Sequence, residues 1–75
     1  MIEAHSNIVL THDIDTARLG AGDIGTVVMV HAKGAAYEVE LMTLGGQTLA
    51  VLTLSSEQIR PAGPGEIAHA RRAPS

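Results

Sequence analysis

The chain has few side chains that could bind a metal ion. Its only imidazoles belong to His5, His12, His31 and His69, and no two of them form a His-x-His or His-x-x-x-His pair. His12 and Asp13 are adjacent and Asp15 follows closely, so a loop cation site is conceivable, because hard cations prefer carboxylate oxygens. Solvated polar residues in a loop explain this cluster better. We therefore expect no metal and no other cofactor.

The side chains that could serve in acid–base or nucleophilic catalysis show no catalytic spacing. Nothing in the sequence brings Asp13, Asp15 and Asp23 into one cleft. For Asp23 we expect a structural role, in which its carboxylate accepts hydrogen bonds from N–H groups of the turn 22–25. Ser55 is better explained as a cap, with a glutamine three residues later, and no Gly-x-Ser-x-Gly elbow is present. We expect that the protein is not an enzyme.

Composition describes a small globular protein. The chain has 75 residues, of which 45% are hydrophobic and 17% charged. A domain of this size buries only about 60% of the surface of its unfolded chain, so oligomerisation is a common means of stabilising it. Tyr37 is the only aromatic residue, so the core must be aliphatic. Without cysteine, a signal peptide or an apolar run long enough to cross a bilayer, a cytoplasmic protein with no membrane contact is expected.

The distribution of charge makes nucleic-acid binding unlikely. The net charge is −3, and residues 1–60 hold seven acidic residues against three basic ones. An acidic domain repels a phosphate backbone. The basic residues near the end of the chain are Arg60, Arg71 and Arg72, which do not form a stripe with stacking aromatic residues.

Runs of aliphatic and β-branched residues between glycine turns predict five short strands. They span residues 6–10, 26–31, 36–42, 48–54 and 59–60. In the third run Tyr37, Val39 and Leu41 alternate with Glu38 and Glu40, as in a strand with one buried face.

Glycines and polar residues mark the connections. A long loop covers residues 11–22, and Asp23 with Gly25 indicates a bend at the start of the second strand. Gly34 is expected to supply positive φ in one hairpin turn, and Gly45 and Gly46 make the next. We therefore predict an all-β fold over residues 1–61. It is a small SH3-like five-stranded barrel with a long first loop and a one-turn 3₁₀ helix before the last strand. Residues 62–75 are predicted to be a flexible C-terminal tail.

Four segments, in this order, resemble a family of very small bacterial proteins described as a domain of unknown function. The segments are GDIGTVVMV, AYEVEL, TLAVLTL and SEQIRP, where the family reads roughly GDxGTVVEV, AYEVEF, TL and QLRP. The resemblance covers about residues 6–61 and supports the barrel. Met29 replaces a glutamate of the family pattern, and Leu41 replaces a phenylalanine. The resemblance implies no established activity, but the position of such genes beside toxin-like genes makes an antitoxin or immunity role a hypothesis.

The predicted strands hold more apolar residues than one small core needs. Alternation places Val27 and Met29 on the face of their strand opposite Ile24, Val28 and Val30. In the fourth strand it places Leu49 and Val51 opposite Ala50, Leu52 and Leu54. Clustered exposed apolar residues mark interfaces. The alternative is that the outer set lies beneath the long loop or the tail.

The preferred hypothesis is a non-catalytic protein-interaction module. It would bind a protein partner, or itself as a homo-oligomer, through Val27, Met29, Leu49 and Val51. A toxin encoded nearby would make it an antitoxin or immunity protein. The alternative hypothesis is a KOW-like nucleic-acid or ribosome-associated module that depends on Arg60.

Overall fold

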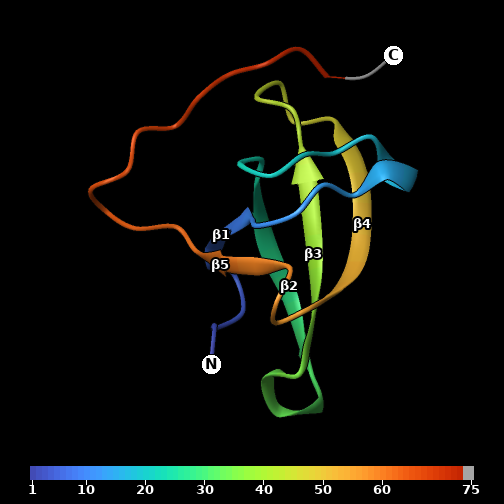
Figure 1. The fold of residues 1–75 in the computed structure, drawn as a ribbon, viewed down its shortest axis with the longest axis vertical. Coiled ribbons are helices and arrows are strands. Elements are labelled where there is room, and N and C mark those ends of the chain that lie inside the picture. Colours follow the sequence, from blue (N-terminus) through green and yellow to red (C-terminus); the bar gives the residue numbers. More distant parts are fainter. Residues whose placement is uncertain (74–75) are drawn as a thin grey trace.

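The computed structural model describes residues 1–73, which form one five-stranded antiparallel sheet (Figure 1). The strands are β1 (Asn7–Leu10), β2 (Ile24–His31), β3 (Ala36–Met42), β4 (Thr48–Ser55) and β5 (Ile59–Pro61). The all-β prediction is confirmed, and each strand lies within two residues of its expected position.

The strand order is β4-β3-β2-β1-β5, so β4 and β5 form the two edges of the sheet. Over the described residues β4 pairs only with β3, and β5 pairs only with β1. The sheet is therefore not closed, and the prediction of a barrel is not confirmed.

The connections differ from the prediction in their helical content. Two 3₁₀ segments, η1 (Asp15–Ala17) and η2 (Ala32–Gly34), lie in the long loop and in the β2–β3 hairpin. Between β4 and β5, where a one-turn 3₁₀ helix was expected, there is a single turn closed by the Gln58 N–H on the Ser55 carbonyl (3.0 Å). The nearby Pro61 and the start of β5 leave no room for this turn to continue as a helix.

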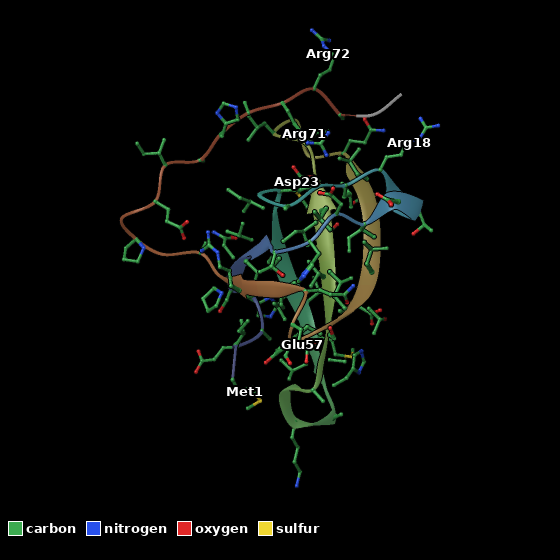
Figure 2. All side chains as sticks on the ribbon, in the orientation of Figure 1. Met1, Arg18, Asp23, Glu57, Arg71 and Arg72 are labelled. Atoms are coloured by element: carbon green, nitrogen blue, oxygen red, sulfur yellow. The ribbon has the colours of Figure 1, made fainter. Side chains whose placement is uncertain are left out.

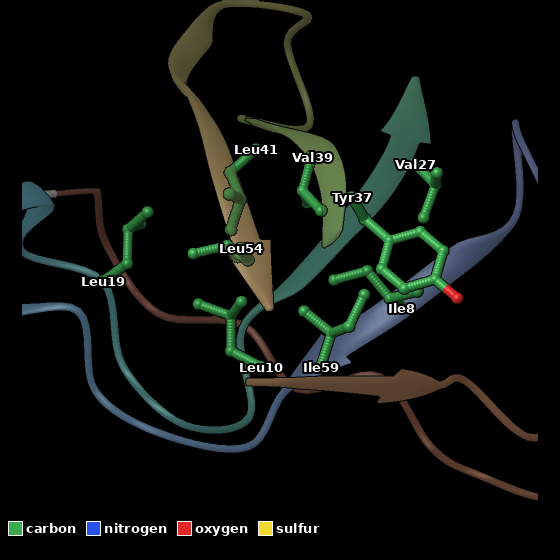
Figure 3. Packing of buried hydrophobic residues seen from close by; sticks show 9 residues of the cluster. All are labelled: Ile8, Leu10, Leu19, Val27, Tyr37, Val39, Leu41, Leu54 and Ile59. Carbon is green, nitrogen blue, oxygen red and sulfur yellow. The ribbon is translucent and has the colours of Figure 1, made fainter. Parts of the chain in front are cut away.

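The core lies on one face of the curved sheet (Figure 3). It consists of Ile8, Leu10, Leu19, Val27, Tyr37, Val39, Leu41, Leu54 and Ile59. The single aromatic side chain is fully buried, and its hydroxyl accepts a hydrogen bond from the backbone N–H of Ile2 at 3.1 Å. The prediction of an aliphatic core around Tyr37 is therefore confirmed. Ile14 and Ala17 of the long loop pack against the edge of this core.

No helix of the described residues is long and apolar enough to cross a membrane. The segment after β5 forms neither helix nor strand over residues 62–73. It leaves the sheet at β5, arches away from it, and returns over the end of the sheet that holds the β3–β4 turn (Figure 1). The last two residues of the predicted tail, 74 and 75, lie outside the described residues.

Gly25 is required by a close approach between strands. Its φ is not in the left-handed region, but a Cβ atom there would lie 2.8 Å from Val39 Cγ1 and 3.0 Å from the carbonyl oxygen of Glu40. These are neighbours that cannot move freely, because Val39 belongs to the core and Glu40 contributes a backbone atom. The absence of a side chain at Gly25 thus lets β2 pass close to β3.

We predict that Gly25→Ala lowers the free energy of unfolding by about 1–3 kcal/mol, the usual cost of overpacking a core. Chemical denaturation followed by far-UV circular dichroism measures it. Gly45→Ala is the matched control, because the atom nearest to its added Cβ lies 3.8 Å away and its φ is not positive. The control should change stability by less than about 0.5 kcal/mol. Equal effects of the two substitutions would contradict the close-approach argument.

Candidate interaction surface

The structure separates the four residues expected at an interface. Met29 is 52% exposed, Leu49 38% and Val51 53%, whereas Val27 is 0% exposed and belongs to the core. The prediction that Val27 faces outward is therefore wrong. Val27 lies opposite Val39 across the β2–β3 ladder, and both side chains point into the core.

A β-bulge causes this difference. The ladder pairs Val27 with Val39 and Met29 with Glu38, so Val28 is an extra residue with no partner of its own on β3. A bulge shifts the inward–outward alternation by one residue. Val27, before the bulge, therefore points inward, and Val28 and Met29 are both exposed. The predicted alternation of inward and outward side chains holds only after the bulge.

The outer face between Met29 and Val51 is polar. On β3, Glu38 lies opposite Met29, and Glu40 lies opposite Val51. The Glu38 carboxylate accepts a hydrogen bond from Thr53 Oγ1 (3.1 Å) and lies 3.3 Å from Nε2 of His31. The exposed apolar residues are thus divided by two hydrogen-bonded carboxylates, and the apolar surface lies along β4 rather than across the whole sheet.

The apolar surface continues round the end of β4 into a groove, which is not among the predicted sites. Its apolar walls include Ile24, Met42, Leu44 and Leu49, with Leu41 of the core beside them. Residues 68–71 of the tail form part of its rim. In the sequence, two apolar residues indicate this groove: Met42 at the end of a predicted strand and Leu44 directly before a glycine turn.

Three of the four glycines expected in turns lie in turns, whereas Gly25 lies within β2, so the prediction of a turn at Gly25 is wrong. Gly34 has φ of 96° and Gly46 has φ of 92°, while Gly45 precedes Gly46 with no positive φ. The Asp23 carboxylate accepts a hydrogen bond from the N–H of Gly20 at 2.8 Å, so it binds the backbone before its own position rather than the residues after it. Lys33 and Ala32 also have positive φ, a conformation that side chains disfavour, at the tip of the β2–β3 hairpin.

Several residues considered for chemistry are engaged in local hydrogen bonds. Asp13 accepts a hydrogen bond from the N–H of Ala21 at 2.9 Å, and Nδ1 of His12 lies 2.8 Å from the hydroxyl of Thr11. Ser55 is bound to Gln58, whose side-chain oxygen accepts its N–H at 2.8 Å. Across residues 1–73 no three histidine, aspartate or glutamate side chains come together in a way that could hold a metal ion.

Two ion pairs between residues far apart in the sequence, or on either side of a turn, hold the tail. The Arg71 guanidinium donates to both carboxylate oxygens of Asp23, from Nε at 2.8 Å and from Nη2 to the other oxygen (Figure 2). Arg60 makes the same kind of fork on Glu66, with both distances 2.7 Å. Hydrogen bonding to Arg71, helped by the N–H of Gly20, holds the pKa of Asp23 below its usual range despite partial burial.

Arg60, together with the N–H of Gly63, lowers the pKa of Glu66 to about 2. Both carboxylates thus bind their arginines in the ionised form. Because their folded pKa values are depressed, these contacts are complete above the ordinary carboxyl range and are lost as the pH falls through the folded values.

Comparison with known proteins gives one match. The model of a family described as "Domain of unknown function (DUF4926)" matches residues 4–61, so the chain belongs to this family. The resemblance to a domain of unknown function is thereby confirmed. Neither the curated proteins nor the solved structures contain a match to the chain. The matched region ends at the last residue of β5, and the tail with its two anchoring residues, Glu66 and Arg71, lies beyond it.

We predict that Arg71→Gln releases the second half of the tail at neutral pH, because it removes the charged fork on Asp23. Backbone ¹⁵N relaxation of Ala68 and Ala70 measures the gain in mobility. Arg72→Gln is the matched control, since Arg72 is adjacent and makes neither of these ion pairs. In the wild-type protein, acidification from about pH 5 should raise the mobility of the tail in the same way, because protonation of Asp23 and Glu66 breaks their ion pairs. The pKa of Glu66 in the folded protein is about 2. Equal mobility in both variants would contradict this anchoring.

Proposed function

We propose that this protein is a non-catalytic protein-interaction module whose contact surface is β4 with the apolar side chains beside it. The observation that carries the proposal is the composition and exposure of this edge strand. β4 contains no charged residue, its Leu49 and Val51 are exposed, and no other strand of the described chain covers its outer side. Exposed apolar surface of this kind is typical of a binding site.

The arrangement suits the binding of protein better than the binding of nucleic acid. Arg60, on which the KOW-like alternative depends, already forms a bidentate ion pair with Glu66, and Arg71 forms one with Asp23. Charges compensated in this way attract phosphate less strongly. The outer face also presents Glu38 and Glu40. The alternative still makes its own prediction, which is salt-sensitive RNA binding that is lost in Arg60→Gln.

The partner under this proposal is a second copy of the chain or another protein. An antitoxin or immunity role is the form of the proposal in which the partner is a toxin-like protein. The surface requires only that the partner supply apolar side chains and free backbone hydrogen-bonding groups, because the edge itself provides both.

We predict that Val51→Glu weakens association of the protein with itself, because each copy would place a carboxylate against apolar surface that self-association buries. Size-exclusion chromatography with light scattering over a range of concentrations gives the mass. Ile67→Glu is the matched control, since Ile67 is 95% exposed and lies on the tail rather than on a strand. Met29→Glu tests the part of the surface across β3 from Val51. Wild-type protein that stays monomeric at all concentrations would contradict self-association.

A further inference from the structure

The two edges of the sheet are protected to different degrees. The β5 edge is three residues long and carries Arg60 and Pro61, a charge and a residue without N–H, which are usual devices against pairing with other chains. The β4 edge has eight residues, and it has no charge, no proline and no glycine. An uncovered edge strand of this length and composition is a template for another strand.

Hydrogen-bonded and non-hydrogen-bonded pairs alternate along the β3–β4 ladder, and this alternation shows which backbone groups of β4 are not used by β3. The N–H of Ser56 donates to the carbonyl of Ala35, which makes these two a hydrogen-bonded pair in line with the β3–β4 register. Hydrogen-bonded pairs recur at every second residue of an antiparallel ladder. Leu52 therefore directs its backbone groups toward β3, whereas Val51 and Thr53 direct theirs away from the sheet.

Ser55 supports this assignment independently. Its N–H donates to the side chain of Gln58 (2.8 Å), and its carbonyl accepts the N–H of Gln58 (3.0 Å). Both groups thus point away from β3, as this alternation requires. They are also already satisfied, so the free part of the edge ends at Ser55. Over the described residues no other segment bonds to the outward backbone groups of Val51 and Thr53.

We infer that β4 pairs antiparallel with β4 of a second copy of this chain, with Val51 opposite Thr53 and the twofold axis at Leu52. This inference rests on the proposed function and names its partner. The free groups favour this register, because pairing Val51 with Thr53 in both directions uses every outward N–H and C=O of these two residues. A shift by two residues in the C-terminal direction would place Val51 against Ser55, whose groups are occupied.

Charge favours a second copy in this register. No residue of β4 (Thr48–Ser55) is charged, so the pairing brings no like charges together along the strand. The carboxylates of the outer face stay apart, because Glu40 and the partner's Glu38 would be three strand spacings apart, about 14 Å. That separation exceeds the Debye length of about 8 Å at physiological salt.

This pairing gives a closed dimer and does not extend to further copies of the chain. A twofold contact uses the β4 edges of both copies at once, so it closes. The joined sheet would then end on both sides at β5, the short edge that carries Arg60 and Pro61. The same chain thus has one edge suited to pairing and one suited to stopping it.

The absence of cysteine allows a direct test by cross-linking. In Leu52→Cys the two thiols would face each other across the axis in a non-hydrogen-bonded pair, with Cα atoms about 4.5 Å apart, within disulfide range. Mild oxidation should give a covalent dimer on non-reducing gels. Thr48→Cys is the matched control on the same strand, because its two copies would be about 27 Å apart. Both variants must first show the circular dichroism of the wild type.

A second pair of variants tests the backbone bonds. Thr53→Pro removes an outward N–H that β3 does not use, and proline is tolerated on an edge strand. It should weaken the dimer about tenfold or more, whereas Thr53→Val, which keeps the N–H, should leave it unchanged. Light scattering gives both dissociation constants, and thermal unfolding shows whether Thr53→Pro remains folded.

The outcomes separate this inference from the proposed function. Efficient cross-linking of Leu52→Cys but not Thr48→Cys, with loss of the dimer in Thr53→Pro, supports both. An oligomer that Val51→Glu disperses, but in which Leu52→Cys does not cross-link, overturns the β4 pairing and leaves the proposed contact surface standing. Wild-type protein that is monomeric at every concentration overturns the β4 pairing and self-association together.

Discussion

The structure depends on the two-residue alternation of β3. Tyr37, Val39 and Leu41 point into the core with no more than 2% of their surface exposed, and Glu38 and Glu40 point out. β3 pairs with β2 over residues 36–40 and with β4 over residues 36–42, so its alternation sets which side chains of those strands are buried, except where a bulge shifts the register. Placing a carboxylate in an aliphatic core is costly, so the opposite arrangement of β3, with Glu38 and Glu40 pointing inward, is excluded.

The sequence is most informative where this alternation is unbroken. The bounds of β3 could be predicted to the residue, and so could the outward position of Val51 and the inward position of Leu54 in β4. It is least informative in β2, where TVVMV is apolar at nearly every position. A run without polar residues does not indicate which of its side chains face the core. The residue types around Val28 also give no sign of the bulge. The misplacement of Val27 follows from that single extra residue.

The tail shows a different limit. Its composition predicts no strand or helix, and residues 62–73 form none, but composition does not reveal which distant charges meet. Arg71 and Asp23 are 48 positions apart, and Asp23 is also engaged by Gly20 in the loop. Such pairs depend on the path of the chain across the sheet. The open sheet has the same origin, because its closure depends on three-dimensional curvature rather than on the strand pattern.

A small domain with an aliphatic core has limited means of stabilising an open sheet. Curvature brings Leu54 of β4 and Ile59 of β5 into one core although their strands do not pair, so the apolar side chains close what the hydrogen bonds leave open (Figure 3). The backbone groups of the edges receive no help from that packing. At β5 the strand is short and the chain turns away, whereas at β4 the strand is long and its turn satisfies only Ser55. The apolar side chains are thus buried within a single copy of the chain, whereas outward N–H and C=O groups of β4 have no partner within it. Water or another strand must supply their hydrogen bonds.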